Sequence, residues 1–183
     1  RAANAQDLLG SQQMKKNIAI VGTGYWGKNL VRNFHAIGAL RTICDSNPES
    51  VTNFINQYDG ILGASSFTEL LGDKKIEGIV IATPAETHFD LAKEALLAGK
   101  DVYVEKPLCL SEDHGTELNK IAGDQSRILM TGHLLWYHPA VTALKDMITN
   151  GALGRIQYIY SNRLNLGKLR REENVLWSFA PHD

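Results

Sequence analysis

The sequence has few cysteines, no long apolar run and almost no net charge. Its two cysteines, Cys44 and Cys109, lie far apart and form neither a CxxC motif nor a zinc-ligand pattern, so we interpret them as reduced, buried thiols of a cytoplasmic protein. No apolar run reaches the roughly 18 residues that a membrane helix needs. The formal net charge of −1 leaves no basic field for nucleic acid and no polybasic patch for a membrane.

The length and composition are those of an ordinary globular protein. The 183 residues, of which 44% are hydrophobic and 21% charged, are enough for one complete domain and part of another. Residues 1–13 lack the apolar segment of a signal peptide, whereas Met14, followed by two lysines, resembles a natural start. We therefore expect residues 1–13 to be a tail or an upstream extension.

Short apolar runs alternate with helical segments over residues 14–131. Such runs are typical of strands buried on both faces of a parallel sheet. Ser66 and Glu69 have the spacing of a capping box that opens a helix. The predicted strands are residues 17–21, 40–44, 78–82, 101–105 and 128–130, and the predicted helices are residues 25–37, 48–58, a short helix after Ser66, 87–99 and 111–122. This alternation predicts an α/β fold with a doubly wound, parallel Rossmann sheet.

The character of the sequence changes after Thr131. Residues 138–150 have helical spacing, with Pro139 in the first turn. Residues 155–165 alternate, are rich in β-formers and predict a long strand. Because one strand cannot bury its own face, we expect residues 132–183 to be the truncated beginning of a second α/β domain, after a first domain over residues 14–131.

A glycine-rich turn follows the first predicted strand and opens a helix, which is the setting of a dinucleotide-binding turn. The residues predicted to bind the dinucleotide are Gly22, Thr23, Gly24, Tyr25, Trp26 and Gly27. The first glycine permits the tight turn, the second lets the backbone approach a pyrophosphate, and the third allows close packing of helix and sheet. The helix N-terminus adds amide groups and a positive dipole end for the phosphates.

Asp45 ends the second predicted strand, where an acid accepts hydrogen bonds from the adenosine ribose hydroxyls. Its charge would repel a 2′-phosphate, so we expect NAD rather than NADP as the cofactor. The alternative is that Asp45 only caps the turn that it forms with residues 46–48.

Two further segments fall where a bound dinucleotide would pass. Thr83 and Pro84 follow the predicted strand 78–82, although the pair also suits a turn that enters a helix. His88 lies in the first turn of that helix. It is either adjacent to the cofactor or an ordinary histidine at a helix start, and the sequence favours neither interpretation.

Glu105, Lys106 and Pro107 close the predicted strand 101–105. Because ligands bind at the carboxyl edge of doubly wound sheets, this segment brings a lysine, stiffened by the proline, to that edge. Hydride transfer from a secondary alcohol needs a base for the hydroxyl proton and a charge to hold the oxygen. Lys106 suits either role, and we predict that Glu105 and Lys106 also lie beside the cofactor. A surface lysine is the ordinary alternative.

Histidines and a tyrosine in two other segments are candidates for the substrate site. His182 lies in the aromatic segment WSFAPHD and suits proton transfer, although a packed or helix-capping histidine is equally compatible. His133 and Tyr137 lie in GHLLWYHP at the predicted domain crossover, where substrate clefts occur. His133 and His138 have no carboxylate nearby, so a metal site is not expected.

Arg163 and Asn165 lie on the predicted strand 155–165, and further cations follow them. Together with Lys168 these side chains are able to grip a diphosphate. For the arginines at 170 and 171, a solvated loop balanced by the glutamates at 172 and 173 is the simpler interpretation.

These motifs resemble those of the glucose-fructose oxidoreductase, inositol dehydrogenase and rhizopine-catabolism (Gfo/Idh/MocA) family. The similarity rests on GTGYWG, ATPAETH, AGKDVYVEKP and GHLLWYHP, covers nearly all of residues 14–183 and has EKP as its most specific mark. It implies an N-terminal Rossmann domain, a C-terminal α/β domain with a large, mostly antiparallel sheet, and NAD(P)-dependent oxidation of a sugar or cyclitol. By that resemblance Lys106 is the active-site lysine and His182 the catalytic histidine.

Residues 161–183 resemble the nucleotide-sugar branch of the family, which oxidises the 3-hydroxyl of UDP-N-acetylglucosamine or its uronate. That branch would use Arg163 and Asn165 around the sugar nucleotide, and its 3-keto product would feed the synthesis of surface polysaccharide. The wider family has an aspartate four residues before the histidine, where this sequence has Ser178. This departure argues against an inositol-type substrate.

Two other functions are compatible with the same residues. One is a dehydrogenase of another sugar or of an inositol, and the other is a non-catalytic dinucleotide-binding module. The presence of both Lys106 and His182 argues against the module. For the full-length protein we expect a sugar or nucleotide-sugar substrate, a homo-oligomer, and neither nucleic acid nor membrane as a partner.

Overall fold

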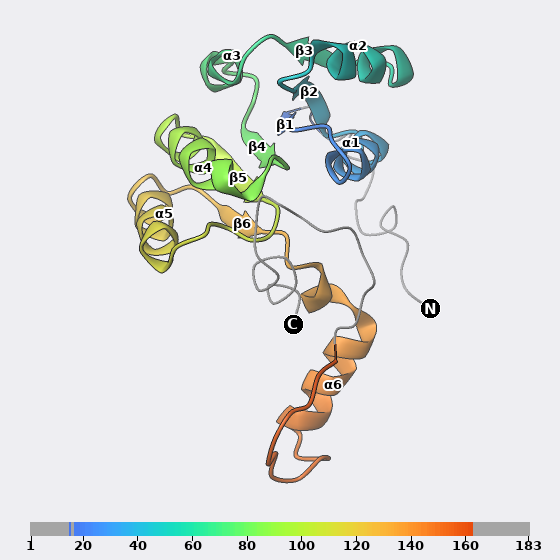
Figure 1. Ribbon diagram of the computed structural model, residues 1–183, viewed down its shortest axis with the longest axis vertical. Helices are drawn as coiled ribbons and strands as arrows, with labels where there is room; N and C mark the ends of the chain where they lie inside the picture. The colour runs from blue at the N-terminus through green and yellow to red at the C-terminus, as the bar shows by residue number, and fades with distance from the viewer. Residues whose placement is uncertain (1–14, 16, 163–183) are drawn as a thin grey trace. The chain divides into compact units, whose positions relative to one another are not determined.

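The computed structural model describes residue 15 and residues 17–162 (Figure 1). The chain divides between Thr131 and Gly132 into two compact units, which are described separately below. Within the described residues, no helix is both long and apolar enough to cross a membrane.

The first unit is built on a six-stranded sheet in the order β3-β2-β1-β4-β5-β6, and every neighbouring pair is parallel. Its strands are β1 (Ile18–Val21), β2 (Leu40–Cys44), β3 (Leu62–Ala64), β4 (Gly78–Ile81), β5 (Asp101–Val104) and β6 (Leu129–Thr131). The chain moves outward in one direction from β1 to β3 and in the other from β4 to β6. The predicted doubly wound α/β fold is confirmed, and its strand order reverses between β1 and β4, where such folds bind ligands.

Helices connect successive strands and cover both faces of the sheet. They are α1 (Gly27–Ala36), α2 (Pro48–Gln57), α3 (Phe67–Gly72), the short 3-10 helix η1 (Ala85–Thr87), α4 (His88–Leu97) and α5 (Glu112–Asp124). Figure 1 shows α4 and α5 on one side of the sheet and α1 on the other. Helices lie on both faces in this way when right-handed crossovers run outward in opposite directions from the centre of a parallel sheet.

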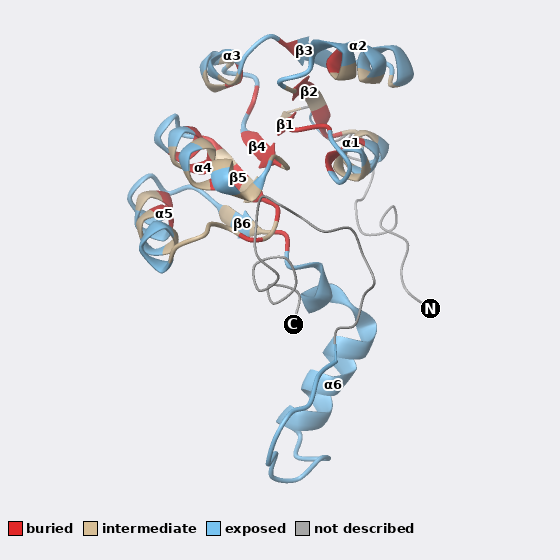
Figure 2. Cartoon of the chain, in the orientation of Figure 1, coloured by how far each residue is buried: buried red, intermediate tan, exposed pale blue. Residues whose placement is uncertain are grey.

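The core consists of two apolar clusters, one on each face of the sheet. Along β1, Ala19 and Val21 contribute to the cluster beneath α4 and α5, whereas Ile20 contributes to the cluster beneath α1 and α2. All four residues of β4 are buried (Figure 2), as expected of a central strand covered on both faces. Removal of this apolar surface from water is the main driving force for the fold.

The helix ends lie where the capping residues predicted them, but the capping box at Ser66 is only partly formed. Ser66 is the N-cap of α3, and its hydroxyl accepts a hydrogen bond from the Glu69 amide at 3.3 Å. The Glu69 carboxylate turns back to the amide and hydroxyl of Ser65 rather than to Ser66. Gly38 follows α1 with a φ of +76°, a conformation that favours glycine at the end of a helix.

Two local features differ from the sequence-based expectations. The strand β3 was not predicted, because Leu62–Ala64 is only three residues long and follows no clear period-2 pattern; it forms by pairing with β2 at the edge of the sheet. The helix α1 begins at Gly27 rather than residue 25, because Tyr25 and Trp26 belong to the turn before it.

The second unit, as far as it is described, contains η2 (Leu134–Tyr137) and α6 (Pro139–Thr149). The His138 side chain caps α6 by accepting a hydrogen bond from the Ala140 amide. The predicted strand over residues 155–165 is wrong for its described part, since residues 155–162 form no strand. A strand needs a neighbour for its backbone groups, and residues 132–162 contain no other strand to pair with it.

Candidate functional site

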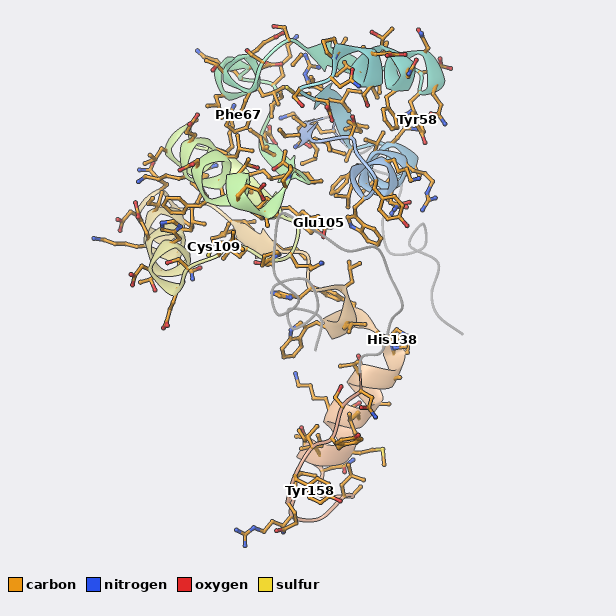
Figure 3. The ribbon with its side chains drawn as sticks, viewed as in Figure 1. Tyr58, Phe67, Glu105, Cys109, His138 and Tyr158 are labelled. Carbon is orange, nitrogen blue, oxygen red and sulfur yellow. The ribbon has the colours of Figure 1, made fainter. Side chains whose placement is uncertain are left out.

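The candidate site lies where β1, β4 and β5 end, next to the reversal of strand order. The glycine-rich turn follows β1, residues 82–84 follow β4, and Glu105 follows β5 (Figure 3). Strand pairing therefore brings three segments that are distant in the sequence to one edge of the sheet.

Each glycine of the turn meets a different steric demand. Gly22 has a φ of +88°, and a Cβ there would lie 2.7 Å from the carbonyl oxygen of Ala82. A Cβ at Gly27 would lie 2.1 Å from the carbonyl oxygen of Gly22, so larger residues would push α1 away from the turn. A Cβ at Gly24 would meet no protein atom within 4 Å. The open side at Gly24 is the approach that a pyrophosphate needs, and the residues fit a bound dinucleotide.

Asp45 holds the turn from the end of β2. Its Oδ2 accepts hydrogen bonds from the Thr23 amide at 2.6 Å and the Thr23 hydroxyl at 2.8 Å, and its Oδ1 accepts one from the Asn47 amide. Burial by itself raises the pKa of Asp45, but these bonds and one from the Ser46 hydroxyl outweigh it and hold that pKa below its usual value. Asp45 is thus an anion that caps its own turn and also fixes the glycine-rich turn.

The Glu105 carboxylate is buried and connects the glycine-rich turn to β5. Its Oε1 accepts hydrogen bonds from Trp26 Nε1 at 2.8 Å and from the Tyr103 hydroxyl at 3.1 Å. Its Oε2 accepts one from the Lys106 amide at 3.3 Å. Tyr103 was missed by the sequence reasoning. In extended chain, residues two positions apart point to the same face of the sheet, so the spacing of Tyr103 and Glu105 was the available signal.

Lys106 directly follows this anchored carboxylate. The residue is half-buried, and its peptide bond to the buried Pro107 is cis. Thr83 forms a hydrogen bond with the Thr87 hydroxyl at 2.7 Å, and Thr87 also donates to the Pro84 carbonyl. Thr83 and Pro84 therefore form a turn that enters a helix, as one of the two interpretations of this pair predicted. Their contact with a cofactor stays a prediction.

His88 is 1% exposed, and both of its ring nitrogens face backbone carbonyls. Nδ1 lies 2.7 Å from the Pro107 oxygen, and Nε2 lies 2.9 Å from the Thr83 oxygen. Contact between His88 and a cofactor stays a prediction. The ring instead joins the ends of two strands of the site.

The remaining predicted residues belong to the second unit. His133 and Tyr137 flank or lie within η2 and are exposed in the structure. Arg163, Asn165 and His182 lie outside the described residues, as do Lys168 and Ser178. Their roles therefore stay predictions.

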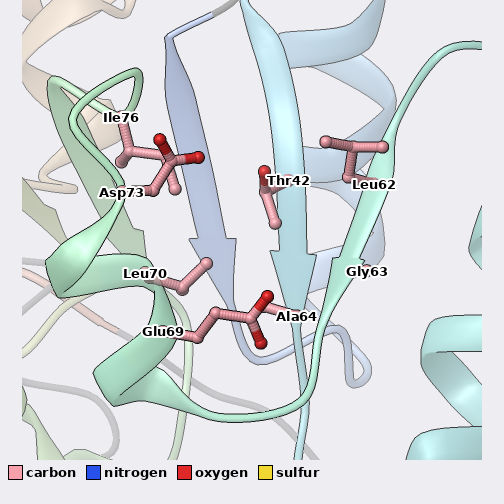
Figure 4. A pocket seen from close by; sticks show the side chains of 8 residues that line it. All are labelled: Thr42, Leu62, Gly63, Ala64, Glu69, Leu70, Asp73 and Ile76. Atoms are coloured by element: carbon pink, nitrogen blue, oxygen red, sulfur yellow. The ribbon is translucent and has the colours of Figure 1, made fainter.

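A separate hollow of about 180 Å³ lies between β2, β3 and α3 (Figure 4). The Thr42 side chain lies on its sheet side and the carboxylates of Glu69 and Asp73 on its helix side. None of the predicted site residues lines it. The two cysteines form no disulfide; Cys44 is buried as expected, whereas Cys109 is only half-buried.

A glycine-rich turn after the first strand, an acid after the second and a reversal of strand order define a dinucleotide-binding domain. Residues 16–133, more than half of the chain, match the oxidoreductase family with an NAD-binding Rossmann fold, GFO_IDH_MocA. The chain belongs to this family. The cofactor that this fold binds is NAD.

Relatives with curated names include two that act on amino sugars according to those names. The chain is 29% identical over 145 residues to 2,7-anhydro-N-acetylneuraminate hydratase of Mediterraneibacter gnavus, covering 79% of this chain and 38% of the relative. It is 27% identical over 165 residues to UDP-N-acetylglucosamine 3-dehydrogenase of Acidithiobacillus ferrooxidans, covering 90% of this chain and 50% of the relative. The chain thus spans half or less of the length of these relatives.

Among solved structures, the chain resembles GenD2 from gentamicin A biosynthesis, which was determined in complex with NAD. The TM-score is 0.72 at 28% sequence identity, and the match covers 79% of this chain and 42% of that one.

Proposed function

We propose that the full-length protein is an NAD-dependent dehydrogenase that oxidises a hydroxyl group of a sugar, and that its substrate is a UDP-N-acetylamino sugar oxidised at the 3-hydroxyl. The observation that carries the proposal is the position of Lys106, which follows the buried, hydrogen-bonded Glu105 at the same sheet edge as the glycine-rich turn. The similarity to UDP-N-acetylglucosamine 3-dehydrogenase supports the finer choice of substrate.

The cofactor would be held by the glycine-rich turn and Asp45. The open side of Gly24 and the N-terminus of α1 would receive the pyrophosphate. Asp45 already accepts four hydrogen bonds, about the full capacity of a carboxylate, so a ribose hydroxyl would replace the Ser46 hydroxyl as a donor. When bound, NAD supplies the acceptor for a hydride from the substrate carbon.

Lys106 would perform the polar part of the reaction. As the C–H bond breaks and the hydroxyl becomes a carbonyl, the ammonium group of Lys106 stabilises the negative charge that develops on the oxygen. His182, by its resemblance to the catalytic histidine of the family, would take up the hydroxyl proton. His133, Tyr137, Arg163 and Asn165 would bind the sugar and its diphosphate.

The test is reduction of NAD by the full-length protein with a panel of substrates. We expect NADH to form with UDP-N-acetylglucosamine or its uronate and not with myo-inositol or free glucose. Oxidation of inositol or glucose instead would refute the nucleotide-sugar substrate but would still support dehydrogenase activity.

Two variants test the mechanism. Lys106→Met should lower kcat by about 1,000-fold, the scale of one lost electrostatic contact to the transition state, while the Kd for NAD changes by less than about threefold. Lys120→Met, on the exposed face of α5, is the matched control and should keep full turnover. Turnover by Lys106→Met at the level of the control would refute the role of the lysine.

A relative named as a hydratase supports a second reaction, the net addition of water to a sugar derivative. In that case the product would gain the mass of one water, and NADH would not accumulate. Mass spectrometry of the products, run beside the NADH assay, separates the two reactions. NAD binding without any turnover over the panel would support a non-catalytic module.

A further inference from the structure

His88 joins two strand ends that flank the candidate catalytic lysine. It is the first residue of α4, and its buried ring lies between the carbonyl oxygens of Thr83, after β4, and Pro107, after β5. The Pro107 contact, at 2.7 Å, is with the residue directly after Lys106. The rigid imidazole ring therefore bridges the segment after β4 and the segment after β5, with one ring nitrogen facing each.

Any hydrogen bond between His88 and a backbone carbonyl requires the ring to be the donor. A backbone carbonyl only accepts hydrogen bonds and an imidazole with one N–H donates only one, so we place the N–H on Nδ1, which makes the shorter contact, to Pro107. Both ring nitrogens thus face protein carbonyls.

The other side of the lysine is anchored as well. Glu105, directly before Lys106, is 7% exposed and accepts hydrogen bonds from Trp26 of the glycine-rich turn and from Tyr103 of β5. The backbone on both sides of Lys106 is thus tied by side chains that come from other segments. The lysine stands between two fixed neighbours.

We propose that His88 is a positioning residue for Lys106. By donating a hydrogen bond to the Pro107 carbonyl while it is seated against the Thr83 carbonyl, it holds the backbone of Lys106 at the distance from the cofactor turn that hydride transfer requires. The inference rests on the proposed function, in which Lys106 contacts the reacting hydroxyl.

Three substitutions separate the two contacts. His88→Phe keeps a flat ring and removes both ring nitrogens. His88→Asn retains an N–H near the place of Nδ1, which faces Pro107, whereas His88→Gln retains one near the place of Nε2, which faces Thr83. His114→Phe, an exposed histidine of α5 stacked on Phe89, is the matched control.

We expect His88→Phe to lower kcat of the full-length protein by at least about tenfold, because a 1 Å displacement of a reacting group can cost about 100-fold. The KM for the sugar nucleotide and the Kd for NAD should change less than about threefold. His88→Asn should recover more of kcat than His88→Gln, because its donor faces the neighbour of Lys106. A purely structural role would lower the unfolding temperature and leave kcat per folded molecule unchanged.

The inference is overturned if folded His88→Phe, or the Asn and Gln variants where the Phe variant does not fold, keep kcat within threefold of the wild type. It is also overturned if His88→Gln recovers more activity than His88→Asn. Lys106→Met is measured in parallel: if it retains turnover, the proposed function fails, whereas its loss together with full activity of His88→Phe removes only the role of His88.

A labelling experiment reads the position of the lysine without turnover. Trace acetylation of the full-length protein, followed by peptide mass spectrometry, gives the relative reactivities of Lys106 and the exposed Lys120. His88→Phe should change the reactivity of Lys106 more than threefold and leave that of Lys120 unchanged. Equal reactivity of Lys106 in the wild type and the variant would contradict the inference.

Discussion

The indole Nε1 of Trp26 donates a hydrogen bond to Glu105 Oε1 at 2.8 Å, across 79 positions of sequence. Trp26 belongs to the turn after β1 and Glu105 follows β5, so the bond spans the end of β4, which lies between those two strands. It covers a buried carboxylate with an aromatic ring that is itself 42% exposed. The turn predicted to bind the dinucleotide and the residue before the candidate catalytic lysine are therefore one connected structure.

The substitution Trp26→Phe tests this connection. It removes a donor from a buried carboxylate, so we expect the free energy of unfolding to fall by about 2 kcal/mol, the scale for a hydrogen bond to a charged group. Chemical denaturation measures the change. Tyr25→Phe, at the neighbouring position that is 86% exposed, should change it by less than about 0.5 kcal/mol. Equal effects of the two substitutions would show that the bond contributes nothing.

The stability of the first unit should depend on Asp45 in acid. Its hydrogen bonds hold the folded-state pKa below the usual value, so its contribution is complete above a pH of about 5 and is lost as the pH falls through the unfolded and then the folded pKa. We expect the difference in unfolding free energy between the wild type and Asp45→Asn to be constant from neutral pH down to about pH 5 and to shrink below that. Denaturation curves at a series of pH values measure it, and a difference that grows in acid would contradict the assignment.

The buried Lys100 stabilises the segment between α3 and β4. Its amine donates to the carbonyls of Asp73 and Ile76, each at 2.8 Å, and burial lowers its pKa against the opposing effect of the Asp73 charge. Lys100→Met leaves both carbonyls unpaired and should cost about 2 kcal/mol of unfolding free energy. Lys93→Met, which breaks a half-exposed ion pair with Glu117, should cost less than about 1 kcal/mol. A larger loss for Lys93→Met would refute the prediction.

Thr42 offers a route to higher stability. Over the described residues, its Oγ1 is the buried side-chain polar atom without a hydrogen-bond partner. Thr42→Val keeps the β-branched shape and removes the unsatisfied hydroxyl, so the unfolding free energy should rise by about 1 kcal/mol. Thr52→Val, whose exposed hydroxyl donates to the Pro48 carbonyl, should be neutral or slightly destabilising. A loss of stability in Thr42→Val would mean that the hydroxyl is hydrogen-bonded in solution.

The strands β1, β2, β4 and β5 were predictable because each is a short apolar run with a polar or glycine-rich boundary, and local periodicity is enough to identify such a run. The glycine-rich turn and Asp45 were predictable for a similar reason, since their spacing within one βαβ unit is what the ligand demands. The strand expected over residues 155–165, of which the described residues 155–162 form no strand, shows the limit of this reasoning. Its β-rich pattern describes side chains, whereas a strand exists only where a neighbour accepts its backbone hydrogen bonds.

The sequence by itself determined the class of fold, the family motifs and the candidate residues, because these depend on local spacing. Only the tertiary structure decided that β3 joins the edge of the sheet, that Trp26 caps Glu105 and that His88 lies between two carbonyls. The partners in these contacts come from different strand ends and helices, and no local periodicity encodes which of them meet. Their meeting follows from strand order, since the carboxyl ends of β1, β4 and β5 are neighbours in the sheet although far apart in the chain.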